Sequence, residues 1–254
     1  MTPTTNKAAT SACHRLVAAL GPVAVLVAVL AAGSAQGQSL MVLPVNILMA
    51  PGQSAATLTV INQGNSETSI QIRAYGWNQQ DGEDQLTTSD AVLVSPPLVT
   101  IAAGASQVVR LVLRRPVQGR EATYRILLDQ IPPPAVPGMV RVVLRLSIPI
   151  FAQPSTRALP HVRFHIEHDA DKMFLVAIND GSRHEAIREV GLLTTDGRKL
   201  KTAAGTTPYV LAGATRRWPI SAEGFAPLSN ETVHMTAHTD AGVIEQQVPI
   251  VSAP

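Results

Sequence analysis

A strand-like alternation of apolar side chains between Met139 and Phe151 constrains the fold more than any other feature of the chain. The apolar residues of this stretch, MVRVVLRLSIPIF, recur with a period of two: Val140, Val142, Leu144, Leu146 and Ile148. A period of two is typical of a β-strand. The opposite face is partly basic and carries Arg141, Val143, Arg145 and Ser147. Such a strand either belongs inside a β-sandwich or is made to pair with another protein.

The rest of the chain consists of short β-rich runs separated by turn signals, with few long helical periodicities. We expect a first set of strands at 40–49, 55–62, 68–78, 106–114, 121–131 and 139–151. We expect a second set at 161–168, 172–179, 186–195, 213–220, 231–239 and 243–251. The pattern is interrupted between Ala152 and Ala158. The sequence therefore predicts an all-β protein with two domains of about 100 residues each, the usual size of an immunoglobulin-like sandwich.

The N-terminus has the order of a secretory signal peptide. Lys7, His14 and Arg15 precede an apolar run from Leu16 to Ala32, and small residues ending at Ala35 follow. This order predicts export and cleavage after Ala35, with neighbouring small residues as alternative sites. A transmembrane anchor is the other interpretation, although the run is barely long enough to span a bilayer. The predicted boundaries are 1–35 for the signal peptide, 36–152 for the first domain and 153–254 for the second.

Cleavage would change both the redox chemistry and the charge of the chain. It leaves 254 − 35 = 219 residues and removes Cys13, the only cysteine, so the mature protein has no internal disulfide. It also removes Lys7 and Arg15 but no acidic residue, which leaves 20 − 2 = 18 basic against 18 acidic residues. This balance does not suggest a nucleic-acid-binding surface.

Histidines are the only candidates for metal chemistry, and their spacing argues against it. His161 and His165 on one strand would lie about 13 Å apart at roughly 3.3 Å per residue, and His168 would face the opposite side. The chain also lacks a nucleophile elbow, a phosphate-binding glycine loop and a zinc-protease motif. We therefore expect no metal, no cofactor and no enzymatic activity.

Three segments before the alternating stretch, YGWNQQDG (75–82), SQVVRL (106–111) and YRILLDQIPPP (124–134), resemble the periplasmic chaperones of the chaperone–usher pilus pathway. The SIPIF ending (147–151) and the Tyr124-Arg125 pair are most similar to the archaic, spore-coat-U-like branch. The resemblance begins near Leu40, is dense through Phe151 and thins over the last hundred or so residues. It implies two immunoglobulin-like sandwiches in an L-shaped arrangement.

The resemblance also implies a function. Chaperones of this kind bind pilin subunits in the periplasm by donor-strand complementation and deliver them to an outer-membrane usher, without a cofactor. Matched to the family, the donor residues are Val140, Val142, Leu144 and Leu146. The alternative is that these residues pack inside their own sandwich. The free protein should shield the apolar edge, for instance by self-association. The rival from another class is a secreted two-domain β-sandwich adhesin or carbohydrate-binding module.

Two further groups of residues are carried over from the family. Arg110, Glu121 and Asp240 match an interdomain charge network; the alternative is that each is a separate surface charge. Asn46 and Pro149 stand where better-known members hold the subunit's terminal carboxylate with basic residues. We expect Arg125 to replace them as the carboxylate anchor, since a guanidinium can hold a carboxylate with two parallel hydrogen bonds. The alternative for Arg125 is an ordinary surface arginine, and Arg73 is a poorer candidate for the anchor.

Overall fold

The computed structural model of the protein describes residues 40–134, 137–138, 140, 142–169, 172–203, 207–221 and 231–252. The predicted signal peptide (1–35) lies outside these residues. Every regular element in the described ranges is a β-strand, which confirms the all-β class. A helix long and apolar enough to cross a bilayer is not found in them.

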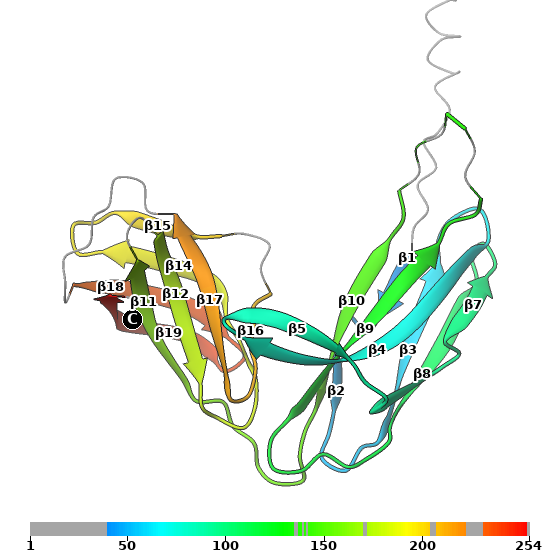
Figure 1. Ribbon diagram of the computed structural model, residues 1–254, viewed down its shortest axis with the longest axis horizontal. Coiled ribbons are helices and arrows are strands. Elements are labelled where there is room, and N and C mark those ends of the chain that lie inside the picture. The colour runs from blue at the N-terminus through cyan, green and yellow to red at the C-terminus, as the bar shows by residue number, and fades with distance from the viewer. Residues whose placement is uncertain are drawn as a thin grey trace, which may run out of the picture. The chain divides into compact units, whose positions relative to one another are not determined.

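Residues 40–152 form a sandwich of two sheets, which we call the first sandwich (Figure 1). Its four-stranded sheet has the order β1 (Leu40–Leu43), β3 (Ala55–Asn62), β8 (Ser106–Leu113) and β6 (Val92–Ser95). The facing sheet has the order β2 (Ile47–Met49), β10 (Arg145–Ala152), β9 (Ala122–Ile131), β4 (Thr68–Gln80) and β5 (Glu83–Thr88), with β7 (Leu98–Ile101) paired to β4.

Alternating apolar residues from both sheets build the core of the first sandwich. Leu58, Ile70 and Leu128 are fully buried, and Ile148 and Ile150 continue the core along β10. Burying one such side chain contributes about 1.5–3 kcal/mol, so a regular period of two along each strand is enough to fix which face points inward.

The first predicted strand, 40–49, is wrong as a single element. Leu40–Leu43 pairs with β3 in one sheet, whereas Ile47–Met49 pairs in parallel with β10 in the other. Pro44 lies between the two segments and has no N–H to donate to a ladder. The chain therefore crosses from one sheet to the other at this proline.

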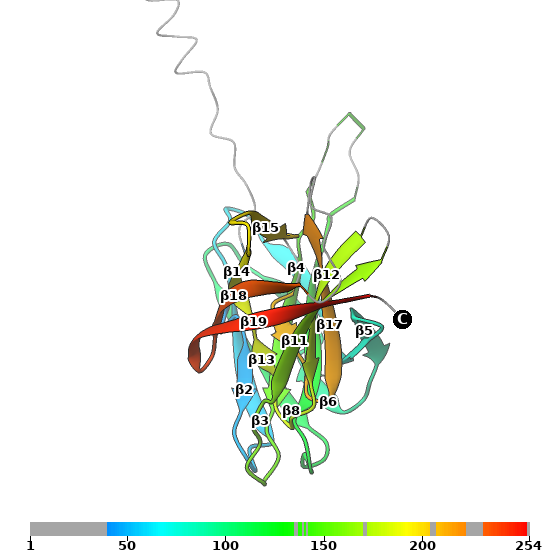
Figure 2. The ribbon, with the colours of Figure 1, turned by 90° about the vertical axis from the view of Figure 1, so that its left-hand side faces the viewer.

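Residues 162–252 form a closed barrel, which we call the barrel (Figure 2). The strand order is β11 (Val162–Asp169), β12 (Lys172–Asn179), β17 (Ala214–Ser221), β15 (Lys199–Thr202), β14 (Arg188–Thr194), β18 (Thr232–Thr239) and β19 (Gly242–Ser252). Two short strands, β13 (Glu185–Ala186) and β16 (Tyr209–Val210), pair separately. Parallel pairing of β11 with β19, where Ile166 faces Ile250, closes the path.

Candidate functional site

The alternating stretch begins as an exposed segment and enters the sheet only at its second half. β10 starts at Arg145, so the strand predicted over 139–151 is shorter in the structure. Val140 is 95% exposed and Val142 is 79% exposed. Apolar side chains that are this exposed at every second position are typical of a surface that binds a partner.

The four predicted donor residues fall into two groups. Leu146 stands opposite Leu128 in the register and packs against the core of the first sandwich, as the alternative interpretation expects. Leu144 is half-buried, and its backbone is held by Gln130: its carbonyl accepts from the Gln130 N–H at 3.0 Å, and its own N–H donates to Gln130 Oε1 at 3.3 Å. Val140 and Val142 precede this point, and both side chains are exposed.

β10 also leaves one of its edges open. β9 pairs with all of β10, whereas β2 pairs with it only over Ile150–Ala152. Over Arg145–Pro149 the second edge of β10 therefore has no strand partner within the described residues. An open edge next to an exposed apolar segment offers both backbone hydrogen bonds and side chains to an added strand.

Arg125 lies on β9 directly opposite Pro149 of β10, and Arg125 is only 8% exposed. Its guanidinium stacks over the Trp77 ring, 3.7 Å from the centroid, and lies 4.0 Å from the Asp84 carboxylate. Burial lowers the pKa of Arg125, partly offset by the negative charge of Asp84. Among the described residues Asp84 is its one ion-pair partner, at a distance too long for a hydrogen bond.

Arg216 of β17 shares this carboxylate. It is 3% exposed, lies 3.6 Å from Asp84 and donates a hydrogen bond of 3.0 Å to the Gly82 carbonyl. Arg125 therefore stands where the β4–β5 hairpin meets the barrel, and it is not an ordinary surface arginine. Arg73, the poorer candidate, is bound to Asp129 at 2.6 Å.

The structure brings Glu121 and Asp240 together, but through a residue that the sequence analysis missed. His184 Nδ1 lies 2.6 Å from Glu121 Oε1, and His184 Nε2 lies 3.9 Å from Asp240 Oδ2. Arg188 then binds Asp240 at 2.9 Å. The network therefore runs Glu121–His184–Asp240–Arg188, and its His184–Glu121 centre is fully enclosed by protein.

Arg110 is placed elsewhere. It lines a cavity of about 480 Å³ with Asn46 and Leu48, and within the described residues it joins none of the ion pairs. Its neighbours Val109 and Leu111 are buried, so strand alternation turns Arg110 outward. The structure therefore does not bring Arg110 to Glu121 and Asp240.

Aromatic rings surround the centre of this network. Phe151, at the end of β10, stacks on the His184 ring with centroids 3.6 Å apart and planes 12° apart. Trp77 and Tyr209 lie 5.7 and 5.0 Å from the Phe151 ring. The last residues of the alternating stretch are thus packed into the contact between the first sandwich and the barrel.

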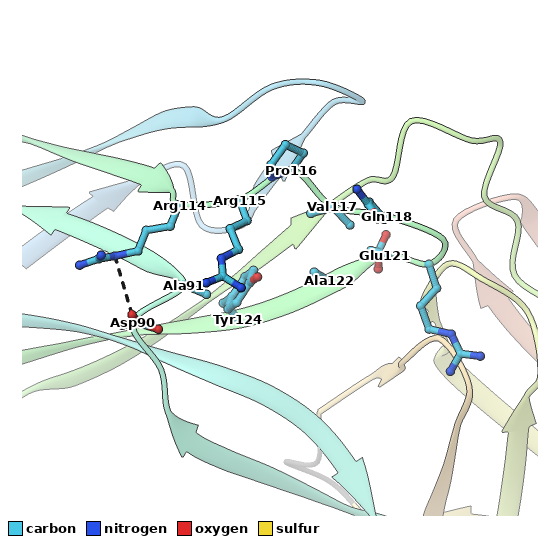
Figure 3. Close-up of a pocket in the computed structure, with 11 residues that line it drawn as sticks. Asp90, Ala91, Arg114, Arg115, Pro116, Val117, Gln118, Glu121, Ala122 and Tyr124 are labelled. Atoms are coloured by element: carbon cyan, nitrogen blue, oxygen red, sulfur yellow. Dashed lines mark ion pairs between the residues drawn. The ribbon is translucent and has the colours of Figure 1, made fainter.

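A basic pocket of about 720 Å³ adjoins Glu121 at the loop between β8 and β9 (Figure 3). Arg114, Arg115 and Arg120 line it, and the one ion pair that crosses it joins Arg114 to Asp90 at 4.0 Å.

Three other histidines belong to local ion pairs, among them His238 with Glu189 at 3.1 Å. His161 pairs with Asp180, and His165 Nε2 lies 3.3 Å from Glu167. Groups of three or more metal-ligating side chains are not found among the described residues.

Comparison with known proteins identifies the family. A sequence model described as "Pili and flagellar-assembly chaperone, PapD N-terminal domain" matches residues 39–158. Residues 39–158 therefore belong to this family of assembly chaperones. No curated protein sequence is significantly similar to this chaperone.

Solved structures share the fold of the chaperone. A chain from the CsuC–CsuE chaperone–tip adhesion subunit complex of archaic Csu pili of Acinetobacter baumannii has a TM-score of 0.62 and 18% identity, over 85% of this chain and all of that one. The YadV chaperone has a TM-score of 0.59 and 14% identity, over 83% of this chain and 98% of its own. A chain from the Salmonella enterica SafA pilin–SafB chaperone complex has a TM-score of 0.56 and 17% identity, over 86% and 98%. These likenesses confirm the two-domain β-sandwich fold; in the second domain the strand path also closes on itself and gives the barrel.

Proposed function

We propose that the protein is a periplasmic chaperone that binds pilin subunits by donating residues 140–144 to an incomplete subunit sandwich, and then delivers them to an outer-membrane usher. The observation that carries the proposal is the exposure of Val140 and Val142 immediately before the open edge of β10. A signal peptide over residues 1–35 would bring the chain to the periplasm.

Strand addition uses both features of this edge. The backbone of an added strand satisfies the unpaired donors and acceptors, and alternate side chains enter the partner's core. Moving Val140 and Val142 from water into an apolar groove contributes about 1.5–3 kcal/mol for each side chain. Leu144 marks the inner end of the donated segment because Gln130 already holds its backbone.

Two of the structural relatives come from complexes that support this choice of partner. One holds a chaperone with a tip adhesion subunit, and the other holds a chaperone with a pilin. The match to the archaic Csu complex also supports an archaic branch assignment, in line with the SIPIF ending of β10.

We propose Arg125 as the anchor for the subunit's terminal carboxylate. Its partners within the described chain, the Trp77 face and Asp84 at 4.0 Å, leave the N–H donors of the guanidinium without a close acceptor. A carboxylate entering beside Pro149 could take two of these donors. The buried position would make such a pair strong, because water competes little there.

Co-expression with the candidate subunit tests strand donation. Val142→Asp should abolish recovery of the subunit with the chaperone, since an unpaired charge entering an apolar groove is costly. Val243→Asp is the matched control: Val243 is 60% exposed on β19 of the barrel, and its change should leave recovery intact. Circular dichroism should show both variants folded.

Full recovery of the subunit with Val142→Asp would contradict strand donation. The rival adhesin or carbohydrate-binding module would be favoured if neighbouring genes encode no usher and no small secreted subunit, and if glycans bind the purified protein.

A further inference from the structure

The barrel carries an apolar hollow that plays no part in the proposed function. The hollow has a volume of about 410 Å³ and is lined by residues of β14, β15 and β18 (Figure 1). Three leucines, Leu192, Leu193 and Leu200, make its lining apolar. Binding sites for small molecules are concave, mostly apolar and about 300–1,000 Å³ in volume. The hollow is therefore large enough to hold a small ligand.

The hollow lies where β15 leaves β14. Within the described residues, β14 pairs with β15 only over Leu192–Leu193, and β15 then continues beside β17 at Lys201–Thr202. On the other side of β14, the register with β18 shifts just before Gly191. Gly191 contributes no side chain, and a Cβ at this position would lie 2.6 Å from Thr236 Oγ1. A larger residue here would therefore crowd the hollow.

Two lysines give the hollow a positive rim. Lys199 and Lys201 line it from β15, where they alternate with the buried Leu200. Because side chains alternate between the faces of a strand, both lysines point away from the core of the barrel. Both are exposed, and within the described residues neither takes part in an ion pair.

Carboxylates of the barrel do not neutralise this rim. Among the described residues that line the hollow, none is acidic. Glu189 and Asp196, the closest carboxylates along the chain, pair with His238 and Arg198. Glu245 lies on β19, three strands from β15 in the order β15, β14, β18, β19. At about 4.8 Å per strand this is about 14 Å, which exceeds the screening length of about 8 Å at physiological ionic strength.

We propose that the hollow binds a free amphipathic anion, a single aliphatic chain that ends in a carboxylate. The leucines cover the chain, and its removal from water supplies affinity. The lysines pair with the head group as point charges that require no fixed geometry. Leu193, at 39%, is the one exposed leucine of the lining. A protein partner would need a broader apolar surface, so the hollow fits a small ligand better.

Titration of the free, full-length mature protein with decanoate, followed through the leucine methyl resonances, provides the test. We expect saturable binding at one site, with the largest shifts at Leu192, Leu193 and Leu200. 1-Decanol has the same chain without the charge, and it should bind about five-fold more weakly, as the loss of two solvent-exposed ion pairs predicts. Acetate has the head group alone and should not saturate the site at the same concentrations.

Variants separate the contribution of the charge from that of the chain. Lys199→Gln combined with Lys201→Gln should weaken decanoate binding about five-fold and leave 1-decanol binding unchanged. Lys172→Gln is the matched control, since Lys172 is an exposed lysine on β12, and it should change neither. Gly191→Val adds atoms to the hollow and should weaken both ligands about ten-fold or more. If Gly191→Val does not fold, the variant of the two exposed lysines still decides the test.

Absence of saturable decanoate binding would overturn the proposal. Shifts confined to other leucines, or equal losses of decanoate and 1-decanol affinity in the lysine variant, would overturn it as well. Binding of phosphatidylglycerol vesicles without binding of decanoate would assign the lysines to a membrane surface and would exclude a site for a free anion. None of these measurements depends on the pilin subunit, so they test the hollow separately from the proposed function.

Discussion

The first sandwich and the barrel are built from similar strands but end their sheets differently. In the barrel, each strand is hydrogen-bonded to the next from β11 round to β19. Because β19 also pairs with β11, the ring of strands closes. In the first sandwich, β10 has no second strand partner over Arg145–Pro149 within the described residues, and an exposed apolar segment precedes it. An exposed strand edge promotes aggregation, so a protein is expected to keep one only where a partner covers it. Under the proposed function, the first sandwich would bind the partner and the barrel would support it.

The largest expected effect separates the two ends of the alternating stretch. Ile148, 4% exposed in the sandwich core, should not tolerate a charge: Ile148→Asp should lower the free energy of unfolding by about 4 kcal/mol or more. Val142→Asp, on the exposed segment, should change it by less than about 0.5 kcal/mol. Urea denaturation of both variants measures the difference. Equal destabilisation would place Val142 in the chaperone's own core.

Arg125→Ala should weaken subunit binding by about 2–5 kcal/mol, the range for truncating one partner of a buried charge pair. Titration calorimetry with a purified subunit, or competition with its C-terminal peptide, measures the loss. Arg73→Ala should do little, since Arg73 is 41% exposed and bound to Asp129.

A double-mutant cycle makes the anchor assignment specific. Amidating the subunit's C-terminus removes the partner charge, so Arg125→Ala should then be nearly silent. Additive losses would assign the carboxylate to another residue, and Arg145 would be the next to test. Arg141, the other basic residue of the stretch, lies outside the described residues.

A substitution in the core of the barrel should lower the stability of the protein but leave its affinity for the subunit unchanged. Met235 is fully buried on β18, and Met235→Ala should cost about 3 kcal/mol through lost burial and a cavity. Below its unfolding temperature the variant should still bind the subunit with unchanged affinity. A large loss of affinity in the folded variant would break the division between the sandwich and the barrel.

The smallest expected effect is a loss of folding stability at low pH. Burial alone would raise the pKa of Asp129, but hydrogen bonds from Arg145 and Arg73 outweigh it, so that the pKa lies below its usual range. The resulting stability is present above the unfolded-state pKa of about 3.9 and is lost as pH falls through the folded-state value. Asp129→Asn should remove this dependence at a cost of about 0.5 kcal/mol near neutral pH. Unfolding curves between pH 2 and 7 measure it, and a pH dependence that remains in the variant would exclude Asp129 as its source.

Local alternation made most of the core strands predictable. The alternating apolar residues Ile70 and Ile72 predict β4, and Ile126 and Leu128 predict β9, because every second side chain is buried. β5 was missed since its sequence, EDQLTT, is polar and largely exposed, and it is held by its hairpin with β4. β6 and β7 were missed because each is four residues long. Short exposed strands carry little hydrophobic signal.

The candidate site was less predictable because its contacts are long-range. Nothing local marks His184, whose partner Glu121 is 63 residues away in the chain. Arg110 could have been set aside from the sequence, since it alternates with Val109 and Leu111 and must face outward. The exposure of Val140 and Val142 also depends on the fold, because the same alternation continues into the buried part of β10.

The β4–β5 hairpin attaches the two halves to each other, in addition to the covalent linker at 153–161 and the contacts of His184 with Glu121 and Phe151. Gln79 donates to the Tyr209 carbonyl at 2.8 Å and accepts from the Leu211 N–H at 3.0 Å, and the Gly82 carbonyl accepts from Arg216. In mechanical terms the halves are joined by several parallel connections, so tension applied to the linker is shared with the others. A protease that cuts the linker should therefore leave the two fragments bound, and the nicked chaperone should elute from a sizing column as one species.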